Sequence, residues 1–342
     1  MMGALNAIGC VSSIVLLVSA CGRFGFSAGG IANEGGIDAG FGEVGDGGAD
    51  ASIDSPLDAS IDASQMGVWA AFAPAPSTTA SLWAVTAFSP SDVWVGGTGG
   101  PINHFDGTSW NLAPGATAQD IFMFWGASGT DLWLVGKACT VQRWNGAIWT
   151  SVALPGCTTE NLFAVAGTAT NDVWIAGVGG TLQHWSGSSW ANHAQSAAVD
   201  LWAVWAETAT DAYVVGSKGT IRHWTGSIIN EDYALNITLA SIWGTGTGEY
   251  WVVGAMGTIL HKVGAGSWTP VASPTTQFLY DVFGTSASDV WAVGSAGTLI
   301  HYDGVQWMPI TAPTTVTLRG VSDVPGGGIR IVGDTGTVLA HP

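Results

Sequence analysis

The chain repeats one motif at intervals close to forty residues, and this repeat limits the available folds more than any other feature. Each copy reads Leu-x-x-Val-x-Gly, a short polar stretch, Asp-Val-Trp-x-Val-Gly-x-x-Gly-Thr, and then x-x-His-aromatic-x-Gly-x-x-Trp. The position of the first aspartate is held by Asp92, Asp131, Asp172, Asp211, Glu249, Asp289 and Gly328, at spacings of 39, 41, 39, 38, 40 and 39 residues. Seven units of this length suit four short strands each, which is the spacing of a β-propeller blade.

The copy at residues 279–310 shows how one unit divides into strands. Apolar and aromatic runs at residues 279–283, 290–293, 298–302 and 306–310 predict four short strands. The second run is apolar throughout, as expected where blades stack face to face and both faces of a sheet leave water. Glycines at the turns, as in Asp303-Gly304, supply the positive φ that tight hairpins need. The sequence therefore predicts an all-β fold of four-stranded antiparallel blades.

The two ends of the repeat region complement each other. The last unit stops after its third strand, but residues 67–74 resemble the fourth strand of other units, such as residues 305–313. An N-terminal strand that completes the last blade would remove the open sheet edge. We therefore expect a closed seven-bladed propeller over residues 67–342. The alternative is an open solenoid of seven units.

The repeated aromatic and histidine residues are interpreted as structural. All 19 tryptophans lie at or beyond Trp69, and those of the second strand are expected to fill the gaps between wedge-shaped blades. These are Trp94, Trp133, Trp174, Trp251 and Trp291. Five histidines, His104, His184, His223, His261 and His301, share one position in the third strand, and Arg143 holds that position in another blade. Equivalent residues of adjacent blades should lie about 10 Å or more apart, too far for one zinc ion. We expect local hydrogen bonds between strands and no metal site.

The N-terminal 66 residues differ in composition from the rest. Residues 4–20 hold an apolar run that ends in Val18-Ser19-Ala20-Cys21, which reads as a secretory signal although no Lys or Arg precedes Arg23. This ending resembles the lipobox of bacterial lipoproteins, which implies a lipid on Cys21, and Gly22 implies the outer membrane of a Gram-negative bacterium. The alternatives are an uncleaved anchor and an ordinary signal peptide. Residues 1–20 are thus predicted to be a signal peptide, and residues 21–66, rich in Gly, Ala, Ser and Asp, a disordered, flexible tether.

Cys139 and Cys157 are the two thiols of the repeat region. Cys139 replaces a glycine of the turn between the second and third strands, and Cys157 falls in the loop that leads to the next blade. In a four-stranded meander these loops emerge on the same face. Because an exported chain meets an oxidising compartment, we predict a disulfide between them. A free, reactive pair is the alternative.

The corner between the third and fourth strands also carries a recognisable motif, as in Asp106-Gly107-Thr108-Ser109-Trp110. It resembles the Asp-box, or bacterial neuraminidase repeat, and the whole unit is similar to the propeller of the photosystem II assembly factor family and of repeat-bearing surface lipoproteins. The resemblance implies a propeller in which these corners lie away from any active site. The corners at Asn145-Gly146, Ser186-Gly187 and Thr225-Gly226 depart from the motif.

Several function classes are disfavoured by the composition. A sialidase needs three arginines that converge on the substrate carboxylate, but the repeat region holds only Arg143, Arg222, Arg319 and Arg330, in positions that should not meet. No phosphate-binding loop is present, so no cofactor is expected. The repeat region has seventeen acidic and seven basic residues, which argues against a nucleic-acid partner. Membrane contact is expected only through Cys21.

The remaining hypothesis is a monomeric interaction module at the cell envelope rather than an enzyme. Its ligand would be a protein or a glycan, held on the face that carries the turns between second and third strands. Non-repeating residues are where specificity can be placed on a repeated scaffold. Here they are Lys137, Lys218, Met256 and Asp334, together with residues 192–200 and 230–236. The alternatives are a carbohydrate-active hydrolase or lyase that uses the propeller face, and a pilus or secretion-complex assembly factor.

Overall fold

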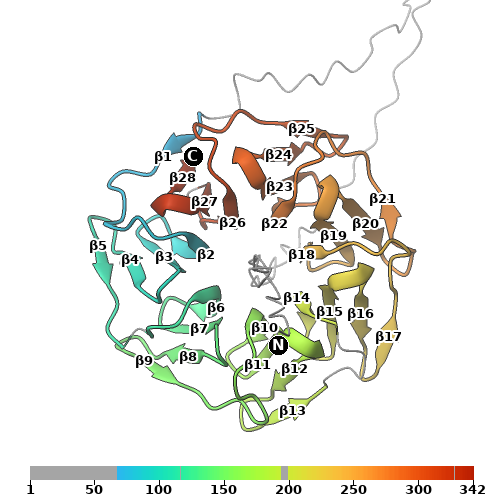
Figure 1. Cartoon of the computed structure of the whole chain (residues 1–342), viewed down its shortest axis with the longest axis horizontal. Coiled ribbons are helices and arrows are strands. Elements are labelled where there is room, and N and C mark those ends of the chain that lie inside the picture. Colours follow the sequence, from blue (N-terminus) through green and yellow to red (C-terminus); the bar gives the residue numbers. More distant parts are fainter. Residues whose placement is uncertain (1–67, 116, 194–198, 327) are drawn as a thin grey trace, which may run out of the picture.

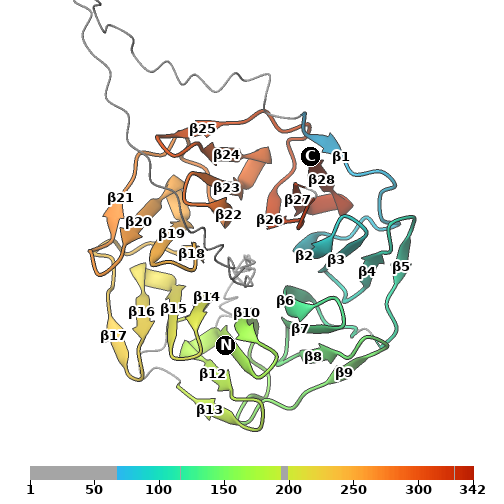
Figure 2. The same cartoon turned by 180° about the vertical axis from the view of Figure 1, so that it is seen from behind.

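The computed structural model describes residues 68–115, 117–193, 199–326 and 328–342. These residues form seven four-stranded antiparallel sheets arranged as blades around a ring (Figures 1 and 2). The predicted all-β, seven-bladed propeller is confirmed. The predictions for residues 1–20, for residues 21–66 and for Cys21 lie outside the described residues.

Each blade runs from an inner strand near the centre of the ring to an outer strand at its rim (Figure 1). The inner strands are β2 (Leu82–Ser89), β6 (Ile121–Ser128), β10 (Leu162–Ala169), β14 (Leu201–Thr208), β18 (Leu239–Gly244), β22 (Leu279–Ser286) and β26 (Leu318–Asp323). The second strands are β3 (Asp92–Gly97), β7 (Asp131–Gly136), β11 (Asp172–Gly177), β15 (Asp211–Gly216), β19 (Glu249–Gly254), β23 (Asp289–Gly294) and β27 (Ile329–Gly333).

The third and fourth strands complete each blade. The third strands are β4 (Ile102–Phe105), β8 (Val141–Trp144), β12 (Leu182–Trp185), β16 (Ile221–Trp224), β20 (Ile259–Val263), β24 (Leu299–Tyr302) and β28 (Val338–His341). The outer strands are β5 (Trp110–Leu112), β9 (Trp149–Ser151), β13 (Trp190–Asn192), β17 (Ile228–Asn230), β21 (Thr269–Pro270), β25 (Trp307–Pro309) and β1 (Ala70–Ala71). We number the blades 1 to 7 from β2 onward, so blade 7 combines β26, β27 and β28 with β1.

The ring is closed by the N-terminal strand, as the sequence predicted. β1 pairs antiparallel with β28, with Ala70 opposite Ala340 and Ala71 opposite Leu339 (Figure 1). Trp69 is 7% exposed, and its ring lies 5.4 Å from that of Trp291 in blade 6. Closure therefore rests on backbone pairing within blade 7 and on aromatic packing against blade 6.

Aromatic side chains fill the gaps between most blades. The five second-strand tryptophans named above are 0–4% exposed, which confirms their structural interpretation. Trp94 of blade 1 packs against Trp144 and Trp149 of blade 2, and Trp251 of blade 5 repeats this arrangement with the next blade. Because each indole buries a large area against the following blade, these residues hold neighbouring blades together.

A buried carboxylate links three inner strands. Asp281 of β22 is fully buried and accepts a hydrogen bond from the Ser241 hydroxyl of blade 5 at 2.9 Å. It accepts another from the backbone N–H of Val321 in blade 7 at 2.8 Å. A buried carboxylate is tolerated only where such donors surround it. Asp281 thus ties blade 7, which closes the ring, to the two blades before it.

Candidate functional site

One face of the ring carries the turns between second and third strands, and we call it the tip face. Each of the seven turns, or tips, places two consecutive residues in the left-handed backbone region. The second of these is glycine in six blades and Cys139 in blade 2. The first is Gly99, Ala138, Gly179, Lys218, Met256, Ala296 or Thr335, in order around the ring. Non-glycine residues in this region are uncommon and cost about 1 kcal/mol or more each.

The tips are held in place by the loop that leads to the next blade. The backbone N–H of Gly219 donates to Ile237 O at 2.6 Å, and that of Gly336 to Ala80 O at 2.8 Å. A Cβ on Gly257 would lie 1.9 Å from Thr275 O, so the loop approaches too closely for any side chain there. The tips are therefore a preformed surface.

The four predicted binding residues all lie on this face, on the tips of blades 2, 4, 5 and 7 rather than in one cluster. The Lys137 side chain is 55% exposed, with Nζ 3.9 Å from a carboxylate oxygen of Asp120. Lys218 is exposed, and Met256 is 66% exposed. Asp334 differs, because Arg319 donates two hydrogen bonds to its carboxylate, at 2.5 and 3.0 Å. Asp334 is therefore already paired, while the other three present their side chains to solvent.

The sequence interpretation missed a row of aromatic residues on the inner side of the tips. They are the second residues of the inner strands, and in blades 1 to 4 they are Trp83, Phe122, Phe163 and Trp202. Successive ring centroids in this row lie 5.2, 5.8 and 4.2 Å apart. In blade 7 the position is held by Arg319, whose guanidinium lies 5.9 Å from the ring of Trp83 and 5.5 Å from that of Tyr280 in blade 6.

This inner row is joined to the tips by hydrogen bonds. The indole N–H of Trp202 donates to the Ser217 hydroxyl at 2.9 Å, and the Ser295 hydroxyl donates to that of Tyr280 at 3.1 Å. The Arg319–Asp334 pair makes the same connection in blade 7. The only sequence signal for the row is the residue after the first leucine of each repeat, which varies too much in type to be recognised as a pattern.

The five repeated histidines pair with carboxylates of their own blades. In each of these blades, Nε2 of the histidine lies 2.5–2.8 Å from a carboxylate oxygen of the acidic residue that begins the second strand. The histidines are His104, His184, His223, His261 and His301. Arg143 makes the equivalent contact to Asp131. Burial alone would raise the pKa of Asp172, but hydrogen bonds from His184 and Thr168 outweigh it and hold the pKa below its ordinary value. The prediction of local hydrogen bonds between strands is confirmed.

The arginines are distributed as the sequence implied. Arg143 lies in blade 2, Arg222 in blade 4, and Arg319 and Arg330 in blade 7. Arg143, Arg222 and Arg319 each contact a different carboxylate, and the Arg330 guanidinium lies 5.0 Å from the ring of Phe72. This arrangement does not place three guanidinium groups around one substrate.

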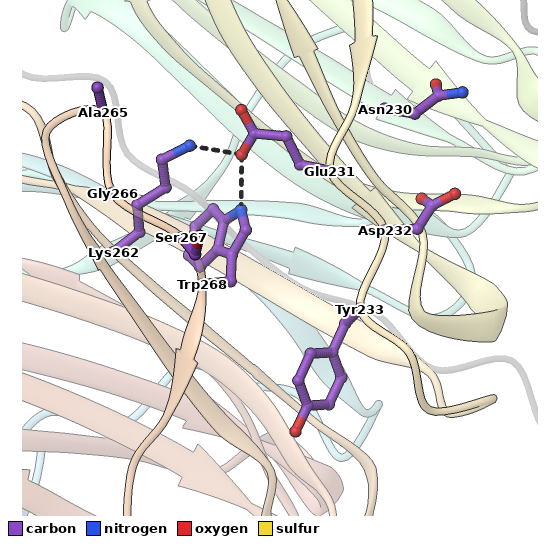
Figure 3. A pocket seen from close by; sticks show the side chains of 9 residues that line it. All are labelled: Asn230, Glu231, Asp232, Tyr233, Lys262, Ala265, Gly266, Ser267 and Trp268. Carbon is purple, nitrogen blue, oxygen red and sulfur yellow. Dashed lines mark hydrogen bonds and ion pairs between the residues drawn. The ribbon is translucent and has the colours of Figure 1, made fainter.

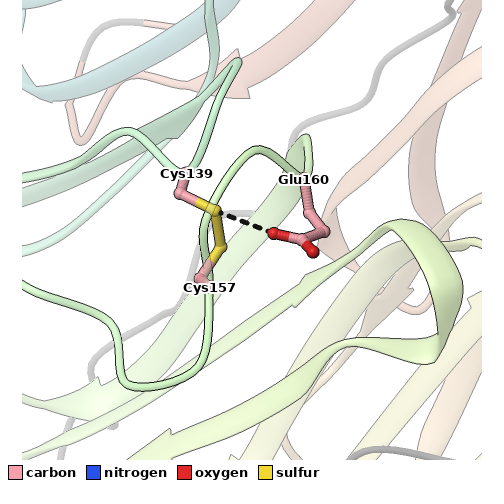
Figure 4. Close-up of side chains that lie close together, drawn as sticks. All are labelled: Cys139, Cys157 and Glu160. Carbon is pink, nitrogen blue, oxygen red and sulfur yellow. Dashed lines mark hydrogen bonds between the residues drawn. A yellow bond between two sulfur atoms is a disulfide. The ribbon is translucent and has the colours of Figure 1, made fainter.

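Cys139 and Cys157 are joined by a disulfide, drawn in Figure 4. The bond connects the tip of blade 2 to the loop between blades 2 and 3, and Oε2 of Glu160 lies 3.2 Å from the Cys139 sulfur. The backbone N–H groups of Thr158 and Thr159 hold the pKa of Glu160 below its ordinary value. Two thiolates and this carboxylate could ligate a metal, but bridged sulfur atoms are poor ligands. In this state the trio is structural.

A pocket of about 430 Å³ opens in the outer wall between blades 4 and 5. One side is the segment after β17, within the predicted stretch 230–236, and the other is the connection from β20 to β21. Figure 3 shows the Glu231, Lys262 and Trp268 side chains meeting between these segments, while Asn230 and Asp232 point away from them. Glu231 Oε2 accepts from Lys262 Nζ at 2.5 Å and from the Trp268 indole N–H at 2.9 Å.

The structure resembles other propellers of known structure. YCF48 from Cyanidioschyzon merolae matches with a TM-score of 0.64 and 16% identity, covering 80% of this chain and 98% of that one. A YCF48 structure bound to D1 peptide matches with a TM-score of 0.65, 16% identity and coverage of 80% and 96%. The WD40 β-propeller domain of Doa1 matches with a TM-score of 0.68, 15% identity and coverage of 81% and 97%. At these identities the likeness establishes the fold.

The sequence comparisons give no further assignment. No protein-family model matches the chain, and no curated protein matches it. Within the described residues, no helix is both long and apolar enough to cross a membrane.

Proposed function

We propose that this chain is an exported protein-binding propeller that holds a polypeptide partner on its tip face. One observation carries the proposal: five of the seven tips keep a non-glycine residue at a strained left-handed position, and these residues differ in chemistry. Backbone strain persists where the surrounding structure enforces it, and it concentrates at binding sites. Lys218, Met256 and Thr335 each project a different side chain from the same rigid scaffold.

The fold and the charge are consistent with this function. A propeller with a similar fold, YCF48, has been solved bound to D1 peptide. The repeat region has seventeen acidic and seven basic residues, so its long-range field favours a partner segment with net positive charge. Variable side chains on preformed turns also avoid the ordering cost that a flexible loop would add to binding.

The cellular setting is part of the same proposal. A lipid on Cys21 would hold the protein at the outer membrane, and residues 22–66 would let the propeller reach a partner some distance away. A single acyl chain binds a membrane only weakly and reversibly, so stable anchoring needs a second chain or another membrane signal. An N-terminal cysteine that carries several acyl chains would meet this requirement.

The test is capture of partners from intact cells with the full-length tethered chain, followed by identification of the captured proteins. Met256→Ser removes a 66% exposed apolar side chain from the tip face, and Val305→Ser removes an 83% exposed one from the corner after β24. We expect a partner that is lost with Met256→Ser combined with Lys218→Ser and retained with Val305→Ser. Equal capture by all variants would contradict the proposal, and turnover of glycosidase substrates would favour an enzyme instead.

A further inference from the structure

The gap between blades 4 and 5 is filled differently from its neighbours. Between blades 1 and 2, Trp94 meets the aromatic residues Trp144 and Trp149 of the following blade. At the blade 4–5 gap, Tyr213 takes the place of the second-strand tryptophan. The third strand of blade 5 has Lys262 where that of blade 2 has Trp144. Tyr213 still contacts aromatic residues of blade 5, with ring centroids 4.6 Å from Tyr250 and 5.9 Å from Trp268, but the Lys262 ammonium group now lies 5.2 Å from its ring.

The outer strands depart from the repeat at the same place. Blade 4 has Ile228 where most outer strands begin with tryptophan. In blade 5 the interval from His261 to Trp268 is seven residues, one longer than the interval of six from His301 to Trp307. The longer connection forms one wall of the 430 Å³ pocket, whose volume falls in the range typical of small-molecule sites. The pocket thus lies where the outer parts of two neighbouring blades both depart from the repeat.

The charges that line the pocket are compensated from within the chain. Lys262 is 5% exposed and pairs with Glu231, whose second carboxylate oxygen lies 3.3 Å from Nδ1 of His223. Asp232 is paired with Arg222 of blade 4 and also accepts from the backbone N–H of Ile221 at 2.9 Å. An ammonium ligand would find both carboxylates already occupied. A phosphate or carboxylate ligand would be repelled by them.

We propose that this pocket binds an uncharged polyhydroxylated ligand, namely one sugar residue of a glycan. The partly exposed indole of Trp268 offers a flat apolar surface for the C–H face of a pyranose. Beside it, the hydroxyl groups of Ser267 and Tyr233, which line the same pocket and are at least partly exposed, can each donate and accept a hydrogen bond, the combination that adjacent sugar hydroxyl groups need. Although the backbone N–H of Tyr233 donates to the tip residue Gly219, neither Lys218 nor Met256 lines the pocket, so sugar binding there does not depend on the protein-binding proposal.

The test is a titration of the full-length chain with D-glucose, D-galactose and N-acetyl-D-glucosamine, followed by saturation-transfer NMR. Tetramethylammonium chloride and inorganic phosphate serve as charged probes. Ala265→Trp, at an exposed position of the pocket wall, fills the cavity without disturbing the Glu231–Lys262 pair. Val305→Trp makes the same addition at the corresponding exposed corner of blade 6 and is the matched control.

We expect saturable binding of at least one sugar, weakened by about tenfold or more in Ala265→Trp, a loss of about 1.4 kcal/mol. Val305→Trp should bind as the unmodified chain does. The inference is overturned if none of the three sugars binds saturably, if the two variants lose affinity equally, or if only the ammonium or phosphate probe binds. Met256→Ser should leave sugar binding unchanged, which separates this result from the fate of the tip-face proposal.

Discussion

Nε2 of His184 lies 2.5 Å from Oδ1 of Asp172, and the same imidazole stacks on the indole of Trp174 with ring centroids 4.2 Å apart. Because the pKa of Asp172 is held below its ordinary value, the carboxyl group is ionised and accepts a hydrogen bond from the Nε2–H group. The repeated histidine thus connects the second and third strands and contributes to the aromatic filling.

Removal of this histidine should destabilise the fold. His184→Ala leaves the 4% exposed Asp172 without its main donor, and we expect the free energy of unfolding to fall by about 1–3 kcal/mol. His104→Ala should cost less, because the Asp92 side chain is 27% exposed and Trp94 also donates to it at 2.7 Å. Urea denaturation of both variants measures the difference. Equal losses would contradict the assigned role of burial.

Stability should decline in acid. The pKa values of Asp172 and Asp289 both lie below the ordinary 3.8, since hydrogen bonds to the ionised form outweigh the effect of burial. At pH values between the lowered folded-state pKa values and the unfolded-state pKa of about 3.9, the unfolded chain binds more protons than the folded one. The stabilisation is therefore fully present above about pH 4 and is lost as the pH falls through the folded-state pKa values.

Unfolding free energies measured from pH 6 downward should show this decline, and Asp289→Asn should flatten it. A stability that stays constant between pH 5 and pH 2, or rises there, would contradict the assignment, as would an unchanged slope in Asp289→Asn.

Strain at the tips can be measured with a matched pair of substitutions. Thr335 has φ 58°, so Thr335→Gly should relieve backbone strain and raise the free energy of unfolding by up to about 1 kcal/mol. The gain is reduced by the larger conformational entropy that glycine gives the unfolded chain. Gly179 has φ 68° and open space where a Cβ would lie, so Gly179→Thr should lower stability through strain alone. Changes of the same sign in both variants would refute the strain assignment.

Ring closure can be tested at its tryptophan. Trp69→Ala removes a 7% exposed indole and should cost about 3–5 kcal/mol, as Trp307→Ala should at the equivalent position of blade 6, where the blade is continuous in sequence. Thermal or denaturant unfolding compares the two. A negligible effect of Trp69→Ala beside a large effect of Trp307→Ala would show that the N-terminal strand does not complete blade 7.

The disulfide should form when the chain is produced in an oxidising compartment. The two cysteines are separated by 18 residues, a loop for which a disulfide stabilises by about 3 kcal/mol. Cys139→Gly combined with Cys157→Ser, which restores the glycine of the other tips, should lose about this amount. Thiol-specific labelling and mass spectrometry report the oxidation state. Two free thiols in freshly isolated protein would contradict the prediction.

Much of the fold could be predicted from the sequence because the repeat constrains each blade locally. Within blade 6 the boundaries agree closely, although β22 extends three residues beyond the predicted end, to Ser286, and β25 is limited to Trp307–Pro309. The short outer strand has only one neighbour within the blade, so its ends lack the pairing that would extend it. Closure of the ring could also be predicted, because the fourth strand that the last unit lacks has a clear counterpart in residues 67–74.

The pocket between blades 4 and 5 and the inner aromatic row were harder to predict from the sequence, because both depend on contacts between blades. Lys262 and Glu231 are 31 residues apart and come from segments of different blades, so no local pattern in the sequence connects them. The inner aromatic row likewise joins residues of different type from successive blades, and the buried Asp281 has no counterpart in the repeat. The sequence placed Lys137, Lys218, Met256 and Asp334 at the tips, where the structure has them, but it did not show that Asp334 pairs with Arg319 of the inner strand of its blade.

The most direct test of the protein-binding proposal is photo-crosslinking in intact cells. A photoreactive amino acid is placed at position 256 on the tip face, or at position 305 on a corner between third and fourth strands, in the full-length chain. The proposal predicts a discrete crosslinked protein from position 256 and none from position 305. Crosslinks from position 305 alone, or the same products from both positions, would contradict it.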